Sequence, residues 1–193
     1  MVNGVGSITR KYVPGLRIDR AFEQLEKKLT RYFKSLNSHH IGEILDFFSE
    51  DFQLHFSGYD DTIDKTALKS ILAWDKGVNG KVSFQNLVIN NELVTIDFTE
   101  QNDFFRLIGI KELKATITYA FDPAGKILKQ TYTPFPDQPS FQEYMKPAVQ
   151  WAKSNRQDEL NEIYPNDQMI FNEEMAKRWL ILLKQWKRAS ESS

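Results

Sequence analysis

The chain has three histidines, His39, His40 and His55, and the histidine side chain can bind a metal or transfer a proton. His39 and His40 are adjacent at an expected helix start, so they cannot face the same way. His55 alternates with apolar neighbours on an expected strand and should face away from them. There is no cysteine, and no further histidine has the spacing of a zinc ligand. We therefore predict no metal and no other cofactor.

Acidic and amide side chains form the next candidate sites. Asp60, Asp61 and Asp64 precede an expected helix, and we interpret them as turn and cap residues rather than as a cation site. The polar run 100–103 ends an apolar strand, where a pocket often has its few hydrogen-bonding groups. An exposed strand end explains that run equally well.

Gln130 and Tyr132 share one face of an expected strand with Leu128. Such polar side chains fit either a satisfied core network or a contact to a ligand. The sequence leaves both interpretations open.

The bulk composition excludes several classes of function. The 193 residues fit one main domain with an appendage. With 25 Lys and Arg against 26 Asp and Glu, the chain has no net field that would attract nucleic acid or anionic lipid. No window has the roughly 18 apolar residues of a membrane span, and the N-terminal stretch lacks the apolar run of a secretory signal. We predict a cytoplasmic protein that binds neither nucleic acid nor membranes.

Hydrophobic periodicity predicts helices first and strands afterwards. A long helix capped by Asp19 is followed by a second capped by Ser38, a strand over residues 52–56 and a short helix capped by Asp64. Two hairpins follow. The first joins 82–89 to 93–104 through Asn90 and Asn91, and the second joins 113–121 to 127–133 through the turn 122–125. This order predicts an α+β fold.

The last fifty or so residues return to helix. Ser140 with Glu143 is typical of a capping box, Pro147 is expected to kink or split that helix, and Asn172 is expected to cap the final one. The final helix carries an apolar stripe that must dock on something. Either it covers the protein's own sheet or pocket mouth, or it binds a partner. The stripe consists of Met175, Trp179, Leu183 and Trp186.

The order of these elements, together with two local matches, resembles the nuclear transport factor 2-like superfamily. The matches are residues 31–37 (Arg-Tyr-Phe-Lys-Ser-Leu-Asn) continuing to 47–56, and Phe121-Asp122 followed by Gly125-Lys126-Ile127. This superfamily includes ketosteroid isomerases, scytalone dehydratase, limonene epoxide hydrolase and SnoaL-like polyketide cyclases.

The resemblance implies a cone-shaped, curved antiparallel sheet wrapped around three N-terminal helices. We therefore expect a flexible segment over 1–18 and a cone-fold domain with a pocket over 19–136. A helical extension over 137–193 would pack on the same domain. A homodimer through the convex face of the sheet is implied by analogy alone.

The resemblance also tests the isomerase mechanism residue by residue. Tyr32 matches the tyrosine that stabilises the oxyanion. The position of the general base is Phe56, and that of the protonated aspartate is Ile117, and neither can transfer a proton. The chain therefore lacks most of the groups that isomerisation by that route requires.

Epoxide hydrolases of this fold use a strand that reads Thr-Glu-Arg-x-Asp. Here residues 99–103 read Thr-Glu-Gln-Asn-Asp, so Asp103 is retained and Gln101 replaces the arginine. Gln101 can orient a water, but it lacks the charge that would stabilise a carboxylate pair. This reading is weakened but not removed.

The predicted pocket is mostly apolar. Strand parity places four side chains on its concave side, and two more join them from the helices. The apolar lining consists of Leu54, Phe56, Ile117, Tyr119, Tyr32 and Trp74. The polar groups expected to orient a ligand are Tyr32, Gln101, Asp103, Gln130 and Tyr132.

Three functions are compatible with such a chain. The first is a SnoaL-like domain that binds a small hydrophobic or aromatic molecule. The second is a cofactor-independent enzyme of the polyketide cyclase, dehydratase or epoxide hydrolase type, with Asp103 as general base and Tyr32 as donor. The third is a dimeric protein-interaction module.

Overall fold

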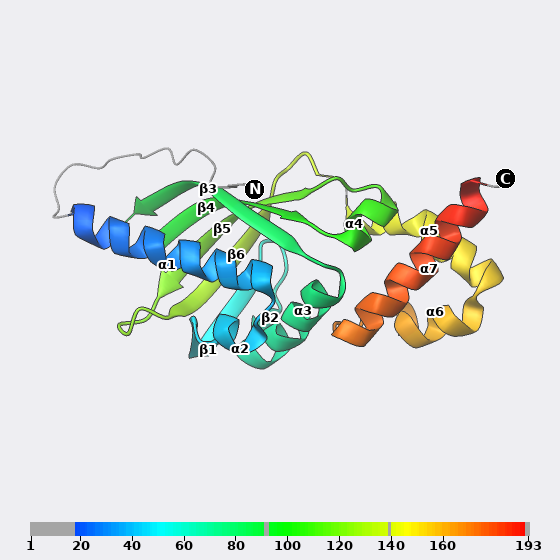
Figure 1. Ribbon diagram of the computed structural model, residues 1–193, viewed down its shortest axis with the longest axis horizontal. Coiled ribbons are helices and arrows are strands. Elements are labelled where there is room, and N and C mark those ends of the chain that lie inside the picture. The colour runs from blue at the N-terminus through cyan, green and yellow to red at the C-terminus, as the bar shows by residue number, and fades with distance from the viewer. Residues whose placement is uncertain (1–17, 91–92, 139, 192–193) are drawn as a thin grey trace. The chain divides into compact units, whose positions relative to one another are not determined.

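The computed structural model describes residues 18–90, 93–138 and 140–191 (Figure 1). The predicted flexible segment 1–18 therefore lies, apart from Ile18, outside the described residues, as does Asn91 of the first predicted turn. The chain divides into two compact units. The sheet unit comprises the described residues of 1–69, 81–100 and 114–136, and the helical unit comprises those of 70–80, 101–113 and 137–193.

The sheet unit contains a six-stranded, mostly antiparallel sheet with the strand order β2-β1-β6-β5-β4-β3. β1 pairs in antiparallel fashion with β2, and β5 does so with β6, whereas β1 and β6 run parallel. The α+β class is confirmed. The strands are β1 (Phe48–Phe56), β2 (Thr62–Asp64), β3 (Lys81–Asn90), β4 (Leu93–Gln101), β5 (Leu113–Phe121) and β6 (Ile127–Pro134).

Helix α1 (Ile18–Ser38) lies across one face of this sheet (Figure 1). It begins one residue before its predicted cap, Asp19. Leu29, Tyr32 and Phe33 are buried, and their steps of one, three and four residues put them on one side of the helix. The Phe33 ring lies 4.6 Å from that of Phe84 on β3. The amphipathic pattern thus fixes which side of α1 meets the sheet.

Two predicted local motifs are confirmed. The Asp64 carboxylate accepts a hydrogen bond from the Ala67 backbone N–H at 2.7 Å, which caps α3 (Lys65–Gly77). In the turn between β5 and β6, the Gly125 N–H donates to the Asp122 carbonyl at 2.8 Å, and Gly125 has φ of 75°. A left-handed conformation of this kind favours glycine.

Two element boundaries differ from the prediction. After helix α2 (Ile41–Leu45), Phe48 begins β1 four residues before the expected strand start, and its side chain is fully buried. β4 ends at Gln101 instead of running to residue 104, because the Asn102 side chain accepts a hydrogen bond from the Phe105 N–H at 2.7 Å. That bond starts a short helix, α4 (Asp103–Ile108), which periodicity did not predict.

The helical unit has its own hydrophobic core. Besides α4 and the second part of α3, it contains α5 (Phe141–Asn155), α6 (Gln157–Ile163), a 3₁₀ turn (Pro165–Asp167) and α7 (Glu173–Glu191). Trp179 and Leu183 of the predicted stripe are fully buried in this core, and Trp151 and Trp186 pack partly buried against it. The stripe therefore docks within the chain itself.

The predicted caps of the C-terminal helices have different outcomes. Asn172 caps α7, since its side chain accepts from the Met175 N–H at 2.8 Å. Ser140 stands at the N-cap of α5 but makes no side-chain capping bond, so the predicted capping box is wrong. α5 runs through Pro147 without splitting.

Close packing of α3 against α7 leads to a first prediction. A Cβ added at Gly77 would lie 2.6 Å from the Ala176 Cβ and 2.9 Å from the Glu173 carbonyl oxygen. Such overpacking costs about 1–3 kcal/mol, so Gly77→Ala should unfold at a lower temperature in calorimetry. Gly42→Ala is the matched control, because no atom lies within 4 Å of its added Cβ. A Gly77→Ala protein as stable as wild type would contradict this packing.

The first turn of α7 leads to a second prediction. The Glu173 carboxylate accepts hydrogen bonds from Lys177 Nζ at 2.6 Å and Lys76 Nζ at 2.8 Å. These bonds lower the pKa of Glu173 to about 2 from a usual 4.5. Because the folded pKa is the lower one, their stabilisation is complete above pH 4.5 and is lost as the pH falls towards about 2.

Glu173→Gln should therefore lower the unfolding temperature at neutral pH. The difference in unfolding temperature between this variant and wild type should shrink on acidification. Thermal unfolding followed across that pH range measures both effects. Glu174→Gln is the control, since Glu174 is exposed in the same helical turn. A difference in unfolding temperature that does not change with pH would contradict the stabilising role of the ionised Glu173.

Candidate functional site

Six of the predicted pocket residues lie on one face of the sheet. Strand register pairs Leu54 with Gln130 and Gln130 with Tyr119, which forms one row across β1, β6 and β5. A second row is formed by Phe56, Tyr132 and Ile117. Directly paired residues project to the same side of a sheet, and each strand contributes residues two apart, so both rows share a face.

One part of this face is filled by aromatic packing. The Tyr32 ring of α1 lies 5.4 Å from Phe47, 5.6 Å from Phe48 and 6.3 Å from Tyr119, measured between ring centroids. Tyr32 and Tyr119 are both buried. Burial raises the pKa of Tyr119 well above its ordinary value, and the nearby Tyr32 raises it further. Tyr119 therefore stays protonated and belongs to the core.

The same face has a more accessible part around Phe56 and Tyr132. Both side chains are half-buried, and their ring centroids are 5.3 Å apart. Phe98 lies 6.2 Å from Tyr132 and supports its ring from β4. Burial, and secondly the negative charge of Glu100, raise the pKa of Tyr132 to about 12. We call Phe56, Phe98 and Tyr132 the aromatic cluster.

The remaining predicted site residues belong to the helical unit. Trp74 is buried there, with its ring centroid 5.5 Å from that of Phe104. Asp103 stands in the first turn of α4, where it accepts a hydrogen bond from Arg106 at 3.0 Å. Gln101 is exposed and donates to Glu112 at the long distance of 3.5 Å. Their roles as ligand contacts, and that of Asp103 as a base, stay predictions.

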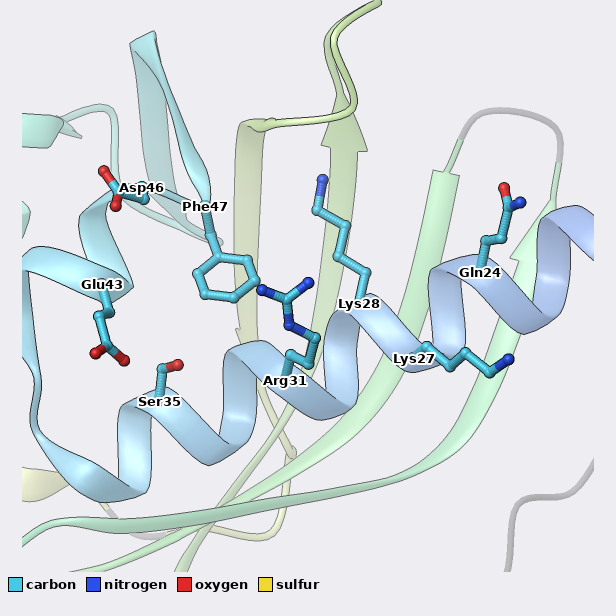
Figure 2. A pocket seen from close by; sticks show the side chains of 8 residues that line it. All are labelled: Gln24, Lys27, Lys28, Arg31, Ser35, Glu43, Asp46 and Phe47. Carbon is cyan, nitrogen blue, oxygen red and sulfur yellow. The ribbon is translucent and has the colours of Figure 1, made fainter.

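A groove on the flank of α1 was not predicted from the sequence. It has a volume of about 650 Å³ and lies between α1 and the segment of α2 and Phe47 that follows it (Figure 2). The signal in the sequence was the spacing of Lys27, Lys28 and Arg31, which puts three cations on one flank of a helix. The lining residues are Gln24, Lys27, Lys28, Arg31, Ser35, Glu43, Asp46 and Phe47.

The histidines do not converge. His40 lies 3.5 Å from Glu43, and His55 is on the opposite face of β1 from Phe56. Within residues 18–90, 93–138 and 140–191, no three His, Cys, Asp or Glu side chains are grouped so as to hold a metal ion. Nor does any helix in those ranges have the length and apolar character needed to cross a membrane.

The fold is similar to that of several solved structures, whereas no protein-family model and no curated protein matches the sequence. The epoxide hydrolase/cyclase-like enzyme SalBIII matches with a TM-score of 0.51 and 16% identity, over 59% of this chain and 93% of that chain. An NTF2-like protein of unknown function from Cytophaga hutchinsonii matches with a TM-score of 0.45 and 11% identity, over 56% of this chain and 87% of its own.

The chain has a nuclear transport factor 2-like fold. Another NTF2-like protein of unknown function, from Exiguobacterium, has a TM-score of 0.47 and 14% identity, over 56% of this chain and 98% of its own. At these identities the likeness concerns the fold. The resemblance inferred from the order of helices and strands is confirmed.

Asn102 leads to a third prediction, since its side-chain hydrogen bond starts α4 just after the polar end of β4. Asn102→Ala should cost about 0.5–2 kcal/mol, as is usual when an N-cap hydrogen bond is lost. Urea unfolding measures the change. Ser140→Ala is the matched control, because Ser140 occupies an N-cap position without a side-chain capping bond. Equal stability of the two variants would show that the cap does not matter.

Proposed function

We propose that the sheet unit binds a small hydrophobic or aromatic molecule at the aromatic cluster, as a SnoaL-like binding domain of the NTF2-like fold. One observation carries this proposal. Phe56 and Tyr132 are half-buried, although they share a face with the fully packed Tyr119 and Ile117. Large rings that stay partly accessible beside a core offer an apolar ligand contact area at low entropic cost.

Polar groups near the cluster can orient the ligand. Tyr132 keeps its hydroxyl proton up to a pKa of about 12, so it can donate a hydrogen bond throughout the physiological range. Gln130 is half-buried one step along β6 on the same face and offers both a donor and an acceptor. A ligand with an apolar ring and one carbonyl or hydroxyl group matches this combination.

Catalysis by the isomerase route has no support from the side chains present. Phe56 and Ile117 occupy the positions of the base and of the protonated acid, and neither side chain can exchange a proton. Tyr32 is packed among aromatic rings on α1, β1 and β5. Binding without chemistry is therefore the function that these residues fit best.

Substitution at Phe56 tests this proposal. A neutral fluorescent probe, N-phenyl-1-naphthylamine, should bind the wild-type protein and gain fluorescence as it leaves water. Phe56→Gln removes an aromatic contact worth about 1.5–3 kcal/mol when fully buried, so it should weaken binding by about tenfold or more. A fluorescence titration measures the dissociation constant.

His55→Gln is the matched control, because it makes the same replacement one residue earlier, on the opposite face of β1. Its affinity should equal that of wild type, and thermal unfolding should show that both variants are folded. No binding to wild type, or equal weakening in both variants, would overturn the proposal.

A further inference from the structure

The groove beside α1 has a charged side and an aromatic side. Lys28 and Arg31 lie one turn apart on the flank of α1, and Figure 2 shows their side chains on the side of the helix that faces Phe47. Glu43 and Asp46 line the groove from α2 and the residue after it. The cations and the carboxylates thus come from different elements and occupy different walls.

Several cations crowd the α1 wall. Lys28 Nζ lies 5.4 Å from the centre of the Phe121 ring and 3.5 Å from where a Cβ on Gly125 would stand, so it reaches over the turn between β5 and β6. Burial lowers the pKa of Lys28; the negative charge of Asp122 opposes this, and the positive charges of Lys126 and Arg31 lower the pKa further. The ammonium of Lys28 is therefore partly desolvated, and it loses its proton more easily than a fully solvated lysine does.

Asp122 is the carboxylate whose charge acts on Lys28. The Asp122 carboxylate already accepts a hydrogen bond from the Lys126 backbone N–H at 2.8 Å. Among the residues that the structure describes, no carboxylate oxygen lies within 4.0 Å of Lys28 Nζ or of the Arg31 guanidinium. An anion entering the groove would therefore find two cationic donors that no carboxylate of the described residues holds in an ion pair.

Phe47 provides a flat apolar surface in the same groove. Its side chain is half-buried, and the Tyr32 ring packs 5.4 Å away at 57°, which holds Phe47 from the core side. A ring fixed in this way can receive a second planar group on its accessible side. The volume of about 650 Å³ is in the range of pockets that bind small molecules.

We propose that this groove binds a small organic anion whose phosphate or carboxylate group pairs with Lys28 and Arg31 while a planar apolar group packs against Phe47. The guanidinium fork of Arg31 suits the paired oxygens of either anion, and Lys28 adds a point charge. Glu43 and Asp46 repel a second anionic group, so a ligand with one charged end is favoured over one with two.

This site is independent of the aromatic cluster. Arg31 and Lys28 lie on the flank of α1, whereas Phe56 and Tyr132 lie on the sheet face and come from β1 and β6. A neutral probe tests the cluster and an anionic probe tests the groove. Either proposal can therefore fail while the other stands.

The test is isothermal titration calorimetry of the full chain with phenyl phosphate, benzoate, inorganic phosphate and benzyl alcohol. Phenyl phosphate or benzoate should bind more tightly than both inorganic phosphate, which lacks the ring, and benzyl alcohol, which lacks the charge. Arg31→Gln and Lys28→Gln should each weaken that binding by about tenfold, as expected for the loss of a charge-assisted hydrogen bond.

Lys129→Gln is the matched control, since this exposed lysine lies on β6 outside the groove, and its affinity should equal that of wild type. Glu43→Gln is a second test that leaves α1 intact, and removing this negative charge should tighten binding. The proposal is overturned if neither aromatic anion binds at millimolar concentration, if inorganic phosphate binds as tightly, or if Lys129→Gln weakens binding as much as Arg31→Gln.

Discussion

The packing of α1 on one face of the sheet is the interaction on which the rest of the sheet unit depends. Tyr32 and Phe33 insert between rings from four strands, β1, β3, β4 and β5. Each large buried aromatic removes about 150–250 Å² from water, so this contact supplies much of the hydrophobic stabilisation available to the unit. It also decides what remains for a ligand, because Phe56 and Tyr132 of the aromatic cluster stay partly accessible on that face. The flank of α1 that carries Lys28 and Arg31 does not take part in this contact, and it forms the cationic wall of the groove.

Local periodicity was enough to predict the faces of the strands. Leu54, Phe56, Ile117 and Tyr119 alternate with polar residues, and a period of two follows from backbone geometry alone. The caps at Asp64 and Asn172 were also predictable, because an N-cap hydrogen bond joins residues only three apart in the sequence. Element order and two local sequence matches then led to the NTF2-like fold, although no protein-family model and no curated protein matches the sequence.

Features that depend on distant residues were not predictable in the same way. The parallel pairing of β1 with β6 joins segments more than seventy residues apart, and nothing in either strand specifies the partner. α4 is too short for a helical period, and its only signal was Asn102, which was interpreted as the polar end of a strand. The groove needs α2 and Phe47 beside α1, and that arrangement cannot be predicted from the spacing of Lys27, Lys28 and Arg31 alone. Trp74 was assigned to the pocket from its helix alone; it lies in the helical unit, and its role as a ligand contact stays a prediction.

The distribution of aromatic residues between the two units gives the molecule two separate optical signals. The helical unit contains all four tryptophans: Trp74, Trp151, Trp179 and Trp186. The aromatic residues of the sheet unit are tyrosines and phenylalanines only. Indole emission excited at the red edge therefore reports the melting of one unit, and near-ultraviolet tyrosine dichroism is weighted towards the other. Comparing the two signals during denaturation distinguishes a single cooperative transition from stepwise loss of structure without any label being introduced.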